Sequence, residues 1–328
     1  MTIDLCCPVC RGTLTCSTDG YSCPACGRGY PFRFGIADFR VAPPAYFDCE
    51  ADLETAARLA EKENSLDAEG LAQYYYRLHP EASDELHARH MAHLAGEADQ
   101  ARAALDEMQR VRPLRRGDAV LEVGCGFGQH LAVAAERVDG VAGVDLSLAF
   151  LVLARKRLNG RGVLLAAEAE RLPFRDGSFA ALIAADVIEH LADPLEAIRE
   201  MGRVLDRGAP LFLSTPNRLT LAAEPHVGLW GVGYLPRAWA NRYVRLRRGL
   251  FYDDVRPLSV FGLRRALGSG FPGTAEVRLP DLSTRQLASF PPLRRELARL
   301  YLALRALPLA RELLYLVGPF FHVLAVKR

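Results

Sequence analysis

The sequence predicts an α/β protein with a doubly wound, mostly parallel sheet, preceded by a small cysteine-rich module and interrupted by helical insertions. Two observations indicate this fold. From residue 117 onward, short apolar runs of strand length alternate with segments of helical period, as in repeated βαβ units. Before that point, six of the eight cysteines lie within residues 6–26. The 328 residues suffice for one large core and an appended module.

The N-terminal cysteines form two CxxC pairs with twelve residues between them, Cys7 with Cys10 and Cys23 with Cys26. Two turns that present paired thiolates match a closed tetrahedral zinc site with a structural role, because a catalytic zinc needs an open position. A disulfide framework is the alternative. The first residues lack the basic and long apolar segments of a secretory signal, which favours zinc and a cytoplasmic location. Cys6 remains a competitor for the position of Cys7.

Residues 43–116 predict a helical linker. Pro43-Pro44 opens it, and an Ala-, Glu- and Leu-rich segment follows, with breaks expected near Gly70 and Pro80. The three tyrosines at 74–76 are candidates for a lid over a ligand. The expected division of the chain is a cysteine-rich module at 1–42, a linker and lid at 43–116, and an α/β domain at 117–328. We expect the module to be separable, so that zinc removal leaves the rest assembled.

The elements of the α/β domain follow from the alternation of apolar runs and helical periods. Strands are expected at 119–123, 141–144, 163–167, 179–184 and 210–214. Helices are expected at 129–138, 148–158 and 193–205.

The first of these strands runs into a glycine-rich turn, Glu122-Val-Gly-Cys-Gly-Phe-Gly128, with the pattern ExGxGxG. Glycines let the backbone bend sharply and approach a ligand at the carboxyl edge of a sheet. Asp145 ends the second strand, where an acceptor-only carboxylate suits the two hydroxyls of a ribose. For Glu122, either contact with the ligand or support of the turn from below remains open.

This turn resembles the first motif of class I S-adenosylmethionine-dependent methyltransferases. The strings Glu168-Ala-Glu-Arg-Leu-Pro-Phe, Asp186-Val-Ile-Glu-His-Leu-Ala-Asp-Pro and Leu213-Ser-Thr-Pro-Asn resemble their ubiquinone/menaquinone-type branch. The resemblance implies a Rossmann-like sheet of seven strands, whose last two form an antiparallel pair at 275–279 and 320–326. Residues 5–40 resemble the zinc ribbon that is fused to, or partners with, methyltransferases, such as the activator subunit of tRNA and protein methyltransferases.

The resemblance also implies a cofactor, S-adenosylmethionine, and its binding residues. The glycines would cradle its methionine part, Asp145 its ribose, and Glu168 its adenine amino group, where the family usually has Asp. Leu146 and Ala169 would pack on the adenine, and the end of the fourth strand would lie near the sulfonium. The expected cofactor-binding residues are therefore Glu122, Gly124, Gly126, Gly128, Asp145, Leu146, Glu168, Ala169, Ala185 and Asp186.

Methyl transfer from a sulfonium depends mostly on positioning and exclusion of water. A base is needed only where the acceptor is a hydroxyl. His190 and Glu189, just after the fourth strand, are the catalytic candidates, because a neutral imidazole can take a proton near pH 7. The alternative is that this pair caps the next helix and shapes the pocket.

Two insertions, at 218–258 and 282–318, are the regions expected to recognise the acceptor. Residues 229–328 contain 17 Lys and Arg against 6 Asp and Glu, a net charge of +11, which favours an anionic acceptor. The second insertion predicts a basic amphipathic helix, so peripheral contact with the inner face of a membrane remains open beside packing on the domain or on a second subunit.

The sequence therefore predicts a methyltransferase for a small-molecule or lipid-linked acceptor. An rRNA or tRNA base methyltransferase and a non-catalytic cofactor-binding module are the alternatives.

Overall fold

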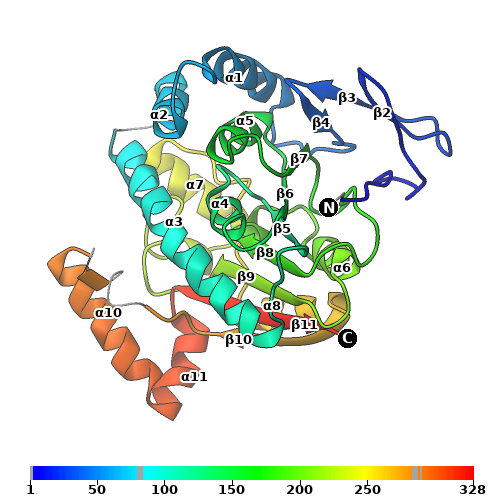
Figure 1. The fold of residues 1–328 in the computed structure, drawn as a ribbon. Coiled ribbons are helices and arrows are strands. Elements are labelled where there is room, and N and C mark those ends of the chain that lie inside the picture. Colours follow the sequence, from blue (N-terminus) through cyan, green and yellow to red (C-terminus); the bar gives the residue numbers. More distant parts are fainter. Residues whose placement is uncertain (1–2, 80–83, 283–286, 289) are drawn as a thin grey trace.

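The computed structural model describes residues 3–79, 84–282, 287–288 and 290–328. Seven strands of the α/β domain lie in the order β7-β6-β5-β8-β9-β11-β10 (Figure 1). The first five of these are parallel, and β11 is antiparallel to both of its neighbours. The predicted Rossmann-like sheet with a final antiparallel pair is confirmed. The strands are β5 (Ala119–Val123), β6 (Gly140–Asp145), β7 (Val163–Ala166), β8 (Ala181–Ala185), β9 (Pro210–Pro216), β10 (Gly273–Arg278) and β11 (Phe320–Lys327).

Helices cover both faces of the sheet, because successive strand residues point to opposite sides. Val120 packs on the face covered by α3 (Asp84–Val111), α4 (Gln129–Ala134) and α5 (Leu148–Arg157). Leu121 packs on the face covered by α6 (Pro194–Val204) and α8 (Val260–Gly270).

The linker forms α1 (Cys49–Lys62) and α2 (Ala68–Leu78), which pack on the same face as α5. The break expected near Gly70 lies a few residues earlier in the chain. The chain turns at residues 63–67 instead, and Asp67 caps α2 by accepting the backbone N–H of Gly70 at 2.7 Å. Pro80, the other expected break, lies outside the described residues.

The N-terminal module, which we call the ribbon (residues 3–42), is joined to this sheet. Its strands are β1 (Thr15–Cys16), β2 (Gly20–Ser22), β3 (Gly29–Arg33) and β4 (Ile36–Asp38). β4 pairs in parallel with β7, with Ala37 opposite Leu165. The seven-stranded sheet thereby continues into a sheet of eleven strands.

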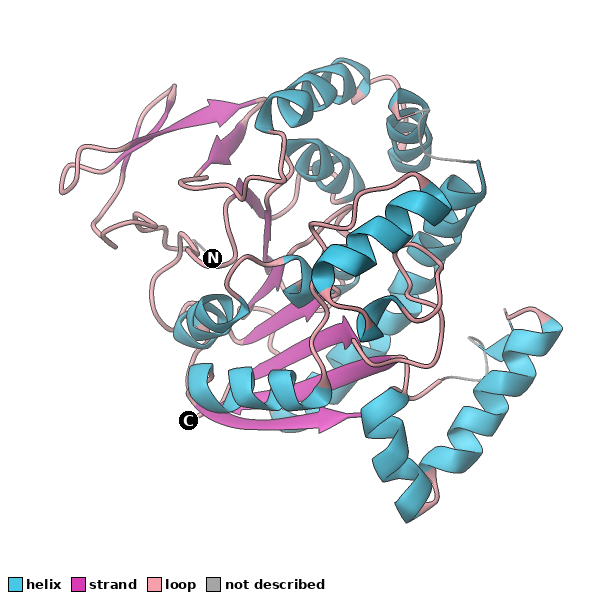
Figure 2. Ribbon diagram, turned by 180° about the vertical axis from the view of Figure 1, so that it is seen from behind, coloured by secondary structure: helices cyan, strands magenta, loops and turns pink. Residues whose placement is uncertain are grey.

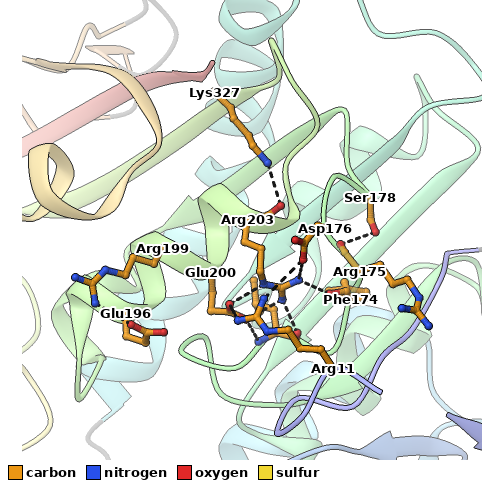
Figure 3. Close-up of polar contacts among 11 residues, drawn as sticks. Arg11, Phe174, Arg175, Asp176, Ser178, Glu196, Arg199, Glu200, Arg203 and Lys327 are labelled. Atoms are coloured by element: carbon orange, nitrogen blue, oxygen red, sulfur yellow. Dashed lines mark hydrogen bonds and ion pairs between the residues drawn. The ribbon is translucent and has the colours of Figure 1, made fainter. Parts of the chain in front are cut away.

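A second contact ties the ribbon to α6 (Figure 3). Arg203 of α6 donates to Glu200 at 2.7 Å, to Asp176 at 2.8 Å and to the carbonyl of Phe174 at 2.7 Å. Arg11, in the first turn of the ribbon, donates to the same Glu200 carboxylate at 2.8 Å. Two arginines therefore share one buried acid, one from each part of the chain.

The second insertion forms a helical hairpin, α10 (Pro292–Arg305) and α11 (Pro308–Val317). Both views show it projecting from the sheet near β10 (Figures 1 and 2). Several of its leucines are exposed, Leu309 to 91% and Leu293 to 75%. Within the described part of the chain, no helix combines the length and hydropathy that crossing a membrane requires.

Candidate functional site

The glycine-rich turn forms an open cradle at the carboxyl end of β5. Gly124 and Gly126 have φ angles of +69° and +47°. A Cβ on Gly124 would lie 2.2 Å from Val187 Cγ2, so only glycine fits there. A Cβ on Gly126 would meet nothing within 4 Å. The turn therefore packs tightly on one side and is open on the other, which fits a bound cofactor.

Asp145 faces this cradle from the end of β6. Its Oδ2 accepts the N–H of Gly126 and its Oδ1 the N–H of Ser147, both at 2.9 Å. Burial, with a smaller contribution from the nearby Asp52 carboxylate, raises the pKa of Asp145 to about 6, although these two hydrogen bonds act in the opposite direction. A carboxylate oxygen can accept a second hydrogen bond, so this fixed group can also bind the two hydroxyls of a ribose.

Asp52 of α1 supports the loop that follows Asp145, and sequence reasoning did not find it. Its carboxylate accepts the hydroxyl of Ser147 at 2.6 Å and the backbone N–H groups of Leu148 at 3.0 Å and Ala149 at 3.2 Å. These bonds satisfy the first donors of α5, as a helix cap does. No local pattern signals this contact, because its partners lie 95 or more residues away.

Arg40, at the end of the ribbon, completes this support. Its guanidinium donates to Asp38 at 2.8 Å, to Asp52 at 3.1 Å and to the carbonyl of Leu146 at 3.1 Å. The side chains of Arg40 and Asp52 are 7% and 6% exposed. The predicted adenine-binding residue Leu146 is therefore held by a buried ion-pair network that begins in the ribbon.

Glu168 has partners that the sequence did not predict. Its carboxylate accepts the backbone N–H groups of Val41 and Ala42, each at 2.8 Å, where the ribbon ends. Binding of the adenine amino group by this carboxylate stays a prediction, as does packing of the buried Ala169 on the ring.

The residues after β8 lie beside the turn. Asp186 has a φ of +53°, and its carboxylate accepts the hydroxyl of Ser214 at 2.8 Å. Ala185, half-buried, is the last residue of β8 before it. Val187 contacts Gly124, as described above. The predicted sulfonium-side residues thus adjoin the cradle.

The two catalytic candidates are largely withdrawn from solvent. Glu189 is fully buried, and its Oε2 accepts the hydroxyl of Thr215 at 3.0 Å. Burial and then the charge of Asp186 raise the pKa of Glu189 to about 8. Burial lowers the pKa of His190, whose carbonyl accepts a hydrogen bond from the Tyr46 hydroxyl.

Glu122 lies beneath the turn, with its Oε1 3.0 Å from His130 Nδ1. Both side chains are buried. This position favours the interpretation of Glu122 as a support of the turn.

Sequence reasoning assigned no catalytic role to His226, in the insertion after β9. Its Nδ1 lies 2.6 Å from Glu224 Oε1, and its ring is 4.9 Å from that of His190. The signal that could have found it is the Glu-Pro-His sequence, an acid two residues before a histidine.

The ribbon gathers the four predicted zinc ligands. The sulfurs of Cys7, Cys10, Cys23 and Cys26 all lie within 4.8 Å of one another. Cys7 and Cys26 are 3.6 Å apart, and Cys10 and Cys23 are 3.4 Å apart. Tetrahedral zinc with Zn–S bonds of about 2.3 Å places its sulfurs about 3.8 Å apart, so the residues fit the metal.

Comparison with protein families matches a methyltransferase domain to residues 121–213. The match begins in β5 and ends in β9, so it contains the turn, Asp145 and the segment after β8.

Known methyltransferases match about a third of the chain. Malonyl-[acyl-carrier protein] O-methyltransferase from Marinomonas sp. is 32% identical over 122 residues, covering 36% of this chain and 45% of that protein. Ubiquinone biosynthesis O-methyltransferase from Pseudomonas paraeruginosa is 37% identical over 109 residues, covering 31% and 46%. The chain thus spans less than half the length of these curated relatives. An S-adenosylmethionine-dependent methyltransferase structure from Mesorhizobium loti aligns with a TM-score of 0.49 at 21% identity, covering 71% of this chain and 100% of that one.

Proposed function

We propose that the protein is an S-adenosylmethionine-dependent methyltransferase that acts on a small-molecule or lipid-linked, anionic acceptor. One observation carries this proposal. In the segment that matches a methyltransferase domain, the backbone N–H of Gly126 in the open turn donates at 2.9 Å to the half-buried carboxylate of Asp145. This pairing offers backbone donors and a diol acceptor in one place.

The cofactor supplies an electrophilic methyl group on a sulfonium. The protein's own residues hold and orient the reactants and exclude water. Asp145 would hold the ribose, the turn would hold the methionine part, and Val187 closes one wall beside Gly124.

Transfer to an oxygen acceptor is supported by the relatives, whose names describe O-methyltransferases of malonyl-[acyl-carrier protein] and of ubiquinone biosynthesis. C-methylation is the other outcome. Recognition of an anionic acceptor is supported by α7 (Arg237–Arg248), whose exposed residues include Arg245 and Arg247. The exposed leucines of the hairpin support contact with an amphiphilic acceptor or the surface of a membrane.

The ribbon would hold zinc through Cys7, Cys10, Cys23 and Cys26 in a structural role. All four positions of a tetrahedral ion are then filled by thiolates, so no open position is left for catalysis.

The experiment combines calorimetry with a transfer assay. The full-length protein should bind S-adenosylmethionine, and Gly126→Arg, which fills the open side of the turn, should not. With the tritiated cofactor and an extract of cells lacking the protein, label should pass to a small or lipid-soluble molecule. Label in RNA would instead establish the base methyltransferase, and cofactor binding without any transfer would establish a non-catalytic module.

A further inference from the structure

We propose that His226, held by Glu224, is the general base that removes the proton from an acceptor hydroxyl. This inference rests on the proposed methyltransferase function and specifies its chemistry as O-methylation. Both residues lie in the insertion after β9, the region expected to contact the acceptor.

Glu224 is a fixed anchor for this imidazole. Its carboxylate Oε2 accepts the backbone N–H groups of His226 at 2.9 Å and Val227 at 3.0 Å, and the residue is buried. Its Oε1 lies 2.6 Å from His226 Nδ1. A carboxylate at this distance requires a proton on Nδ1, so Nε2 of the neutral ring is the proton acceptor.

The accepting nitrogen points toward the end of the sheet that holds the cradle. His226 Nε2 lies 3.9 Å from Oε1 of Glu189, which follows β8. Among the described residues, no hydrogen-bond partner meets that oxygen. Val187, two residues before Glu189, contacts the turn at Gly124, so Nε2 of His226 lies on the side of the sheet where the cradle stands.

His226 is also more accessible to a ligand than the buried Glu189. Its side chain is 27% exposed, whereas that of Glu189 is 0% exposed. His190 is a weaker candidate, because burial lowers its pKa and its imidazole is hydrogen-bonded to the backbone of Asp254.

The charges around His226 increase its basicity. Burial alone would lower its pKa, but the hydrogen bond and charge of Glu224, followed by the charges of Glu189 and Asp186, raise it above the ordinary histidine value. The ring of His190 packs edge-to-face against that of His226, and the hydroxyl of Tyr252 lies beside Glu224.

The step balances without a further reactant. The acceptor O–H bond breaks and its proton passes to Nε2 of His226. The oxygen forms a bond to the methyl carbon while the carbon–sulfur bond of the sulfonium breaks and leaves its electron pair on sulfur. His226 then returns its proton to water at its exposed edge.

The experiment uses the full-length protein with its cofactor and the extract assay described above. His226→Ala should slow transfer by about 100- to 10,000-fold and leave the affinity for S-adenosylmethionine unchanged by calorimetry. Added imidazole should restore part of the rate. Tyr234→Phe is the matched control, since it removes a hydroxyl of the same insertion that donates to the carbonyl of Leu219 at 2.6 Å, and it should act like the wild type.

A pH series separates a base from a structural residue. The wild-type rate should rise with pH as His226 loses its proton, with the midpoint that histidine NMR gives for its ring. Glu224→Gln should lower both midpoints together, because it removes the charge that stabilises the protonated ring.

An unchanged rate in His226→Ala, or a loss matched by an equal loss of cofactor affinity, would overturn the inference. So would activity that requires a divalent cation in the protein whose ribbon keeps its zinc, because Glu189, His190 and His226 would then be metal ligands. Absence of transfer by the wild type would defeat the proposed function itself, and the inference with it.

Discussion

The ribbon and the helical hairpin are both additions to the α/β domain, but they contact it in different ways. The ribbon shares backbone hydrogen bonds with β7 and places Arg40 in a buried network with Asp52 and the carbonyl of Leu146. The hairpin instead projects from the sheet (Figure 2). Leucines such as Leu309 are exposed on it.

The two additions therefore have different roles: the ribbon supports the cofactor site, and the hairpin leaves its apolar side chains exposed. At the end of the ribbon, the backbone N–H groups of Val41 and Ala42 donate to the carboxylate of Glu168, which is predicted to bind adenine. The expectation of a separable module is therefore not supported by the contacts. We expect the ribbon to govern stability and cofactor binding, and the hairpin to govern only what the protein binds outside its core.

The largest effect should come from Arg40→Met. This change leaves the buried carboxylate of Asp52 and the half-buried carboxylate of Asp38 without their cation, and breaking a buried pair costs about 3–5 kcal/mol. Urea denaturation measures it. The control is Arg311→Met in the hairpin, whose half-exposed side chain lies 3.9 Å from Glu312 and whose loss should stay within about 0.5 kcal/mol. Equal losses of unfolding free energy in the two variants would contradict the proposed difference between the ribbon and the hairpin.

Zinc removal should come next. Without a metal the cysteine turns lose their crosslink, and β4 and Arg40 lose the fold that holds them against β7 and Leu146. We expect the affinity for S-adenosylmethionine to fall by about 5- to 150-fold, the usual range of coupling between two sites. Calorimetry before and after chelation, with zinc added back, checks this. Unchanged affinity in the zinc-free protein would mean that the ribbon is separable after all.

The pH dependence of cofactor binding should be of similar or smaller size. The pKa of Asp145 is raised to about 6, and only its charged form accepts hydrogen bonds from both ribose hydroxyls. Affinity should therefore fall about tenfold from pH 7 to pH 5, as the carboxylate gains its proton. The stability of the free protein has the opposite sign, because a raised carboxyl pKa makes the fold less stable as pH rises through about 4 to 6. Asp145→Asn should bind weakly and equally at both pH values, and a pH-dependent Asn variant would assign the titration elsewhere.

The smallest effect on the fold should come from the hairpin. Leu309→Ser together with Leu313→Ser removes exposed apolar groups, so the free energy of unfolding should change by no more than about 0.5 kcal/mol. Sedimentation with vesicles rich in anionic lipid should decrease for this variant. If the wild type does not sediment with such vesicles, the hairpin does not bind them.

Local patterns in the sequence predicted most of the sheet. The runs at 119–123 and 210–214 were found because buried parallel strands are continuous apolar segments, and β5 begins and ends as expected. The glycine turn and the cysteine pairs were found because their spacing is local.

The parts that could not be predicted depend on contacts between distant residues. β4 has only three residues, too few to signal a strand that pairs with β7. In the sequence, Asp52 is indistinguishable from a solvent-exposed acid on a helix, because its contact with the start of α5 depends on how the two helices pack. His226 stands in a glycine-rich insertion with no period, so its approach to Glu189 emerges only from the fold.

The pairing of β4 with β7 has a consequence for shortened forms of the protein. A chain that began after residue 42 would leave the backbone groups of Leu165 and Ala166 that now face β4 open along one side of β7. An exposed edge strand of this kind can pair with a strand of another molecule. The ribbon therefore also serves as a cover against self-association, and its removal should yield a protein that precipitates.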